Sequence, residues 1–163
     1  MSLDDPTVAA DRTIDVERRI AAPPETVFLY FTDPKRYRLW QGVDAELEPR
    51  AGGRFRVVMN GRSGQVVSGA FLEVDPPNKL RFTWGWEPAD GLDAGQSAVA
   101  PGSTIVEVTL VPDGDGTILR LRHTGLSTET SRRLHAWGWD FTLGRLQVAA
   151  ADGDAGPNPF ADF

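Results

Sequence analysis

The chain contains two histidines and no cysteine, so imidazole is the side chain best suited to proton transfer or metal binding. His123 lies on the apolar face of a predicted strand, and His135 lies on the inward-facing side of a predicted helix. Both rings are therefore expected to approach the same interior space. No third metal ligand lies at a recognisable spacing, so we predict no metal site and assign no catalytic residue. Hydrogen-bonded core histidines fit the pattern as well.

Other chemistry-bearing residues give weaker signals. Arg145, near the same inward arc, could pair with a ligand carboxylate or phenolate, or could extend its guanidinium to the helix edge. Gly52-Gly53 has no following helix and no Lys-Ser/Thr pair, so it predicts a hairpin turn rather than a phosphate loop. No serine lies in a nucleophile elbow, and the paired acids lack an apolar setting. The sequence predicts no cofactor.

Composition limits the classes of function. With 163 residues, 40% of them hydrophobic, the chain suits one domain with a single core. We expect a flexible leader over 1–11, a domain over 12–150 and a flexible tail over 151–163. A net charge of -6 argues against a nucleic-acid partner. There is no run of 18 apolar residues and no basic N-terminal region, which predicts a cytoplasmic protein without a membrane partner.

The segment from His135 to Leu146 predicts a long helix with two internal glycines. Each glycine costs about 1 kcal/mol of helix stability relative to alanine. The large aromatic residues beside Gly138 leave a gap over it, which predicts a pocket; close packing of this helix on a sheet is the alternative. A helical wheel gives the centre of the predicted inward arc as Ser131, His135, Gly138, Thr142, Arg145 and Ala149.

Most of the chain before this helix alternates between apolar and polar residues and therefore predicts strands. A first strand, 12–20, is followed by two short helices that end near Trp40. The remaining strands are predicted over 43–48, 54–59, 65–74, 80–86, 104–111 and 117–124.

Because side chains alternate between the two faces along a strand, the alternation of apolar and charged residues predicts that one face of the sheet is apolar and the other charged. A sheet of this kind needs a cover on one side only, and the C-terminal helix is the only element long enough to provide it. The fold class is therefore α+β, with a curved antiparallel sheet of about seven strands around one long helix. Trp84, Trp86, Trp137 and Trp139 are predicted to be core residues; alternatively, Trp84, Trp86 and Trp139 line a cavity and stack on a ligand.

The chain resembles the SRPBCC (START and birch-pollen-allergen-like, helix-grip) superfamily over about 15–150. It is similar in particular to the branch of the C-terminal domain of the activator of heat-shock-protein-90 ATPase. The residues that carry this resemblance are Ala22-Pro23-Pro24-Glu25-Thr26-Val27-Phe28, Trp40, Gly52-Gly53-Arg54-Phe55, Gly69, Val74-Asp75-Pro76-Pro77-Asn78-Lys79-Leu80, Thr83-Trp84, the segment 117–125, and His135-x-x-Gly138-Trp139 with Leu143 and Leu146.

The resemblance implies a helix-grip fold with a hydrophobic cavity between the sheet and the C-terminal helix. It does not imply one activity, because the superfamily includes carriers of apolar molecules, cyclases and aromatases, and a chaperone activator. The segment from Glu87 to Gly102 looks like an insertion that could cover one mouth of the cavity. We expect the cavity wall to include Tyr30, Phe82, Trp84, Val108, Leu121, His123, His135, Trp139, Thr142 and Arg145.

Three hypotheses of function follow. The first is a binding protein for a small hydrophobic or aromatic ligand, as a monomer or homodimer. The second is an enzyme of the cyclase, aromatase or hydrolase type, in which His123, His135 or Arg145 would polarise a carbonyl group. The third is a stress-response protein with a chaperone partner.

Overall fold

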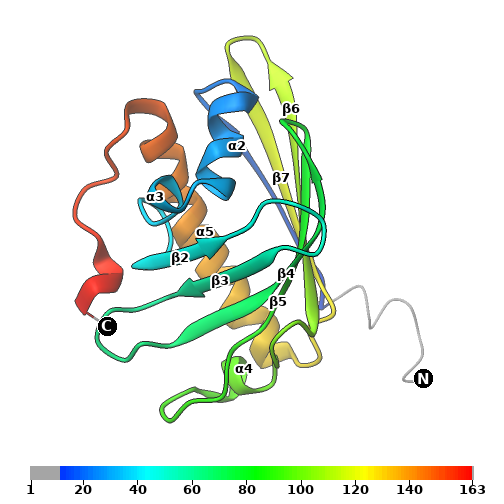
Figure 1. Ribbon diagram of the computed structural model, residues 1–163, viewed down its shortest axis with the longest axis vertical. Coiled ribbons are helices and arrows are strands. Elements are labelled where there is room, and N and C mark those ends of the chain that lie inside the picture. The colour runs from blue at the N-terminus through cyan, green and yellow to red at the C-terminus, as the bar shows by residue number, and fades with distance from the viewer. Residues whose placement is uncertain (1–11, 163) are drawn as a thin grey trace.

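The computed structural model describes residues 12–162 (Figure 1). The leader predicted over 1–11, and residue 163, lie outside the described residues. The elements in chain order are β1 (Ile14–Ile20), α2 (Pro24–Thr32), α3 (Pro34–Tyr37), β2 (Asp44–Leu47), β3 (Arg54–Val58), β4 (Val66–Asp75), β5 (Lys79–Trp84), α4 (Ala94–Ser97), β6 (Thr104–Asp113), β7 (Gly116–Thr124), α5 (Glu129–Asp152) and the 3-10 helix η1 (Pro159–Asp162).

The strands form one seven-stranded antiparallel sheet in the order β1-β7-β6-β5-β4-β3-β2. Each strand from β2 to β6 pairs with the next one in the chain, and β1 pairs with β7, so that Ile14 lies opposite His123. Figure 1 shows the long helix α5 running across the sheet, with α2 and α3 near its C-terminal half and α4 near its start. The predicted α+β helix-grip architecture is therefore confirmed.

The predicted parity of the strands is also confirmed. Along β5, Leu80, Phe82 and Trp84 are at most 2% exposed, and the intervening residues lie on the opposite face. The same alternation buries Val106, Val108 and Leu110 of β6 and Leu119 and Leu121 of β7. These side chains and the inner side of α5 make one hydrophobic core, which places the interior of the molecule between the sheet and the helix.

Helix α5 is 24 residues long and is capped at both ends. The hydroxyl of Thr128 accepts a hydrogen bond from the Ser131 amide at 3.0 Å, and Gly153 ends the helix with a φ of 83°. Ser131, His135, Thr142 and Ala149 of the predicted arc are buried, but the buried side is turned toward one flank: Trp139 and Leu143 are buried, whereas Trp137 on the other flank is 66% exposed. The prediction that Trp137 is a core residue is therefore wrong.

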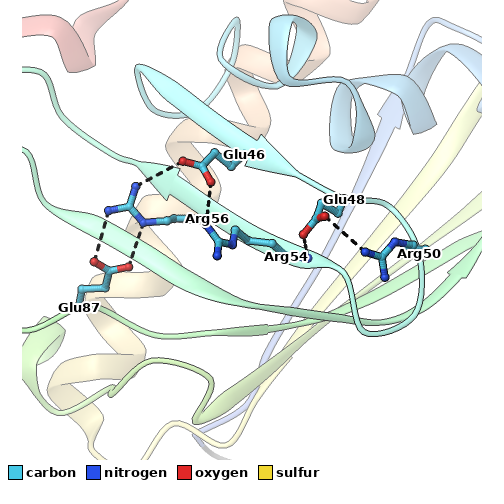
Figure 2. Close-up of polar contacts among 6 residues, drawn as sticks. All are labelled: Glu46, Glu48, Arg50, Arg54, Arg56 and Glu87. Atoms are coloured by element: carbon cyan, nitrogen blue, oxygen red, sulfur yellow. Dashed lines mark hydrogen bonds and ion pairs between the residues drawn. The ribbon is translucent and has the colours of Figure 1, made fainter.

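The outer face of the sheet is charged, and ion pairs connect its strands. Figure 2 shows Arg56 of β3 between two carboxylates, Glu46 of β2 and Glu87. The Arg56 guanidinium donates to both oxygens of Glu87, at 3.1 and 3.4 Å, and this contact raises the pKa of Arg56. The start of the 87–102 segment is thereby tied to β3.

None of the helices within residues 12–162 has the length and apolar character needed to cross a membrane.

Candidate functional site

A half-open pocket of about 310 Å³ lies between the N-terminal half of α5, the ends of β3 and β5, the α4 segment and the C-terminal η1. Gly138 lies on its wall. A Cβ atom added to Gly138 would meet nothing within 4 Å, so this glycine faces open space and is not a point of close helix-to-sheet packing. The residues that line the pocket are Gln41, Met59, Asn60, Trp84, Trp86, Gln96, Leu134, His135, Trp137, Gly138, Trp139, Phe141, Thr142 and Phe160.

Aromatic rings dominate the pocket wall. Inside, Trp84 packs against Trp139 with ring centroids 5.0 Å apart, and Trp86 meets Trp84 edge-on at 6.4 Å. At the mouth, Trp137 stacks on Phe141 with an angle of 4° between the ring planes. This outer pair is solvent-exposed: 66% for Trp137 and 38% for Phe141. The pocket thus has a buried aromatic floor and an exposed aromatic rim.

His135 is fixed in one neutral tautomer. The indole Nε1 of Trp86 lies 3.1 Å from His135 Nε2, and an indole nitrogen can only donate, so Nε2 accepts. The other ring nitrogen, Nδ1, lies 2.7 Å from the carbonyl oxygen of Ser131, which can only accept, so Nδ1 carries the proton. Both nitrogens of His135 are therefore occupied.

His123 is fixed in the opposite tautomer. The indole Nε1 of Trp139 donates to His123 Nδ1 at 3.1 Å, which leaves the proton on Nε2. His123 Nε2 lies 2.8 Å from Thr104 Oγ1, and that hydroxyl donates in turn to the carbonyl oxygen of Trp84 at 2.7 Å. The whole chain of donors and acceptors is satisfied when the ring is neutral.

Burial favours the neutral form of both rings. It lowers the pKa of His123 well below the ordinary value of 6.5, and the neighbouring His135, 5.4 Å away between ring centroids, lowers it further. Burial also lowers the pKa of His135, against smaller raising effects from Ser131 and Asp93. With both rings neutral and all four nitrogens paired, neither histidine has a free lone pair for a substrate or a metal. Residues 12–162 contain no group of three or more histidine or acidic side chains suited to a metal ion.

A polar chain crosses the other side of the pocket. Thr142 Oγ1 donates to the Gly138 carbonyl oxygen at 2.9 Å and accepts from Gln41 Nε2 at 3.3 Å. The amide oxygen of Gln41 accepts from the phenol of Tyr37. Burial raises the pKa of Tyr37, so this phenol keeps its proton. Gln41 is only 2% exposed and is held in one orientation.

The C-terminal segment forms a wall of the pocket. The sequence predicts a flexible tail over 151–163; in the structure α5 extends to Asp152 and the chain then follows a defined path as far as residue 162. Phe160 is 8% exposed and meets Phe141 edge-on. The Gly61 amide donates to the Phe160 carbonyl oxygen at 2.8 Å, and a Cβ atom on Gly61 would lie 2.6 Å from the backbone of Ala161.

Arg145 holds this segment in place from α5. Its guanidinium donates to the carbonyl oxygens of Ala155 and Pro157, at 3.1 and 3.4 Å, and to that of Leu39 at 3.1 Å. These carbonyls belong to the C-terminal segment and to the end of the α3 region. Arg145 therefore joins two backbone segments and does not line the pocket.

The ten residues expected on the cavity wall fall into separate places. Trp84, His135, Trp139 and Thr142 line the pocket, and His123 lies directly behind Trp139. The others that were expected there fill the core: Tyr30, Phe82, Val108 and Leu121 are at most 7% exposed. Tyr30 donates to the Ala149 carbonyl oxygen at 2.9 Å, and Phe82 stacks on Phe55 at 4.2 Å.

Several lining residues escaped the prediction. Gln41 follows a short helix, Asn60 lies in a turn and Phe160 lies in a segment without periodicity, so none carried a pattern. Trp137 and Phe141 did carry a signal, because they are four residues apart and flank Gly138.

The 87–102 segment contains α4 and packs on the start of α5. Ser131 Oγ donates to the Gly95 carbonyl oxygen at 2.8 Å. The backbone amide of Trp86 donates to the Val99 carbonyl oxygen at 2.7 Å. Gln96 brings this segment to the pocket. The insertion predicted from sequence thus lies beside the mouth; whether it moves as a cover stays a prediction.

Comparison with solved structures identifies proteins of the same fold. The AHSA1-like protein RHE_CH02687 from Rhizobium etli is 41% identical, with a TM-score of 0.66 over 91% of this chain and 88% of that one. CV1439 from Chromobacterium violaceum is 27% identical, with a TM-score of 0.72 over 86% of this chain and 98% of that one. CalU16 from Micromonospora echinospora is 28% identical, with a TM-score of 0.65 over 86% and 76%.

No curated protein matches the chain significantly. A family model does match it: the model of activator of Hsp90 ATPase homolog 1-like proteins covers residues 21–151. The match includes strands β2 to β7 but not β1, and it runs almost to the end of α5. The chain belongs to the family of activator of Hsp90 ATPase homolog 1-like proteins.

Proposed function

We propose that this protein binds a small, mainly apolar, aromatic molecule in the pocket beside Gly138. The observation that carries the proposal is the pocket itself: about 310 Å³, walled by four tryptophans and two phenylalanines. This volume is at the lower end of the range found for small-molecule sites, which are usually lined by apolar and aromatic side chains with a few polar groups.

Two features of α5 support the proposal. Gly138 lowers the stability of the helix by about 1 kcal/mol relative to alanine. No neighbouring group is close enough to explain why a residue without a Cβ atom is needed here. Trp137 and Phe141 expose apolar rings at the pocket mouth, where a ligand would cover them. Both features are unfavourable for the empty protein, and the contacts of a bound ligand would offset them.

The hydrogen bonds of His123, His135 and Arg145 favour a binding protein over an enzyme that uses these three side chains for catalysis. His123 and His135 use every ring nitrogen within the protein, and Arg145 uses its guanidinium on backbone carbonyls. A general base needs a free lone pair within hydrogen-bond reach of the substrate. These three residues support the pocket in the structure rather than presenting reactive atoms to it.

A pair of glycine substitutions tests the proposal. Gly138 and Gly144 lie on the same helix, and an added Cβ atom meets nothing within 4 Å at either, but only Gly138 lines the pocket. We expect Gly138→Leu to fill the pocket and to weaken binding of the uncharged fluorophore N-phenyl-1-naphthylamine at least about tenfold. Gly144→Leu should leave that binding unchanged.

Fluorescence titration measures both variants, and circular dichroism checks that both fold. Native mass spectrometry of the purified wild-type protein adds an independent search for a co-purified small molecule. Equal binding of the fluorophore by both variants would refute the pocket as the site. Absence of both fluorophore binding and a co-purified molecule in the wild type would refute the function.

A further inference from the structure

We infer that the ligand of this pocket is uncharged and carries a hydrogen-bond acceptor, such as a carbonyl oxygen, that binds the side-chain amide of Gln41. This inference rests on the proposed function and specifies the chemical class of its ligand. Two independent observations carry it: the absence of charged side chains from the pocket wall, and an amide donor whose orientation is fixed by its neighbours.

The pocket offers no partner for a charged ligand. None of its lining residues is an Asp, Glu, Lys or Arg, and the lining histidine, His135, is neutral and accepts a hydrogen bond from the Trp86 indole. Burying a charge without a counter-ion is strongly unfavourable in an apolar site.

The orientation of the Gln41 amide follows from the residues bonded to it. Thr142 gives its hydroxyl proton to the Gly138 carbonyl oxygen, so toward Gln41 it can only accept. The Gln41 atom facing Thr142 is therefore the nitrogen, and the amide oxygen faces the donating phenol of Tyr37. If the Gln41 amide were flipped, its oxygen would face the Thr142 hydroxyl oxygen. Two acceptors would then oppose each other, and the hydrogen bond between Gln41 and Thr142 would be lost.

This arrangement leaves one donor unused. The Gln41 amide nitrogen has two hydrogens, one of which goes to Thr142; within residues 12–162 the second has no partner. Gln41 is 2% exposed, and a buried donor without a partner is unfavourable. Because Gln41 lines the pocket, an acceptor atom on the ligand satisfies this hydrogen. The same amide offers a cation no acceptor, because its oxygen is already bonded to the Tyr37 phenol, and the wall carries no acidic side chain.

A series of naphthalenes of nearly equal shape tests each part of the inference. The probes are 2-acetylnaphthalene, which is uncharged with an acceptor; 2-isopropenylnaphthalene, which lacks the acceptor; 2-naphthoate, an anion; and 2-naphthyltrimethylammonium, a cation. Affinities are measured by calorimetry and by quenching of tryptophan fluorescence. We expect 2-acetylnaphthalene to bind at least about tenfold more tightly than either ion and severalfold more tightly than 2-isopropenylnaphthalene. Equal or tighter binding of either ion would overturn the inference.

Two matched variants locate the acceptor contact. Gln41→Met should abolish the preference for the acetyl over the isopropenyl probe, because the acetyl oxygen then has no donor at this position. Gln96→Met makes the same change at another lining residue. Gln96 is only half-buried, its amide nitrogen donates to Gln65 and its oxygen accepts from the Asp93 amide, so solvent can satisfy its remaining hydrogen and the variant should retain the preference. A preference that persists in Gln41→Met would overturn the assignment.

If Gln41→Met does not fold, Thr142→Val serves instead. It removes the acceptor that orients the Gln41 amide, and it should reduce the preference severalfold; an unchanged preference would overturn the assignment. Failure of the proposed function looks different from failure of the inference: in the former, no naphthalene binds, or binding survives Gly138→Leu. In the latter, binding is lost in Gly138→Leu but does not depend on charge or on Gln41.

Discussion

At the scale of single residues, two tryptophans determine the chemistry of two histidines. The indole N–H groups of Trp86 and Trp139 each donate to one imidazole, and each donation leaves the proton on the opposite ring nitrogen. His123 and His135 therefore have different tautomers although their rings are 5.4 Å apart. Phenylalanine would fill similar space in either tryptophan position but could not set the tautomer.

We expect Trp139→Phe to lower the free energy of unfolding by about 2–4 kcal/mol. It leaves the buried Nδ1 of His123 without a donor, which costs about 1–3 kcal/mol, and it removes packed indole atoms. Trp137→Phe is the matched control two residues away; because Trp137 is 66% exposed, it should change stability by less than about 0.5 kcal/mol. Urea denaturation measures both, and equal effects would contradict the role given to the indole donor.

At the scale of elements, the helix was predicted over 135–146, whereas α5 spans Glu129–Asp152, and its rotation was predicted only in part. Ser131, His135, Thr142 and Ala149 of the predicted arc are buried, but Gly138 and Arg145 are half-buried, and burial extends instead to Trp139, Leu143 and Leu146. Both flanks of the helix carry large apolar residues, so periodicity alone does not determine which flank is buried. The sheet selects the flank that fills its concave face, and the other flank, with Trp137 and Phe141, remains at the pocket mouth.

The C-terminal segment was not predictable because it has no period; single contacts hold it. Arg145 binds Ala155 and Pro157 on one side and Leu39 on the other. We expect Arg145→Met, which keeps much of the side-chain length, to lower the free energy of unfolding by about 1–2 kcal/mol, since charge-assisted hydrogen bonds to carbonyls are lost.

The same substitution should speed hydrogen exchange at the Gly61 amide, which donates to Phe160 in that segment. Arg133→Met is the control on the same helix: Arg133 is largely exposed, and its partner Glu129 also pairs with Arg132. It should leave Gly61 exchange unchanged. If Arg145→Met likewise leaves the protection of Gly61 unchanged, Arg145 does not hold the C-terminal segment.

At the scale of the whole molecule, the parity of the strands predicted which face is buried but not where space remains. Phe82, Val108 and Leu121 lie on the predicted face and fill the centre of the interior completely. The pocket lies off-centre, where the sheet ends, the helix carries glycine and the C-terminal segment closes one side. The position of an unfilled volume depends on the sizes of many side chains together and on the positions of loops. A local pattern in the sequence therefore does not predict it.

The stability of the whole domain should decrease as the pH falls below about 6.5. In the unfolded chain both histidines bind protons near that pH, whereas burial keeps their folded pKa values lower, so the unfolded state holds more protons in the window below 6.5. The stabilisation is complete above this pH and is lost progressively as the pH decreases toward the folded pKa values. Each histidine contributes a slope of up to about 1.4 kcal/mol per pH unit.

Urea unfolding at intervals from pH 7.5 to 5 measures this dependence, and NMR shifts of the imidazole protons report the folded-state titration. In His135→Gln, the amide oxygen can still accept from Trp86 but does not titrate, so the slope should fall to about half. Histidines that titrate near 6.5 in the folded protein, with stability constant across the window, would show that the rings are not held neutral. Because the pocket wall includes His135, its protonation would place a charge beside a ligand that we expect to be uncharged, so affinity of the folded protein for 2-acetylnaphthalene should weaken only as the pH falls through the lowered folded pKa of His135.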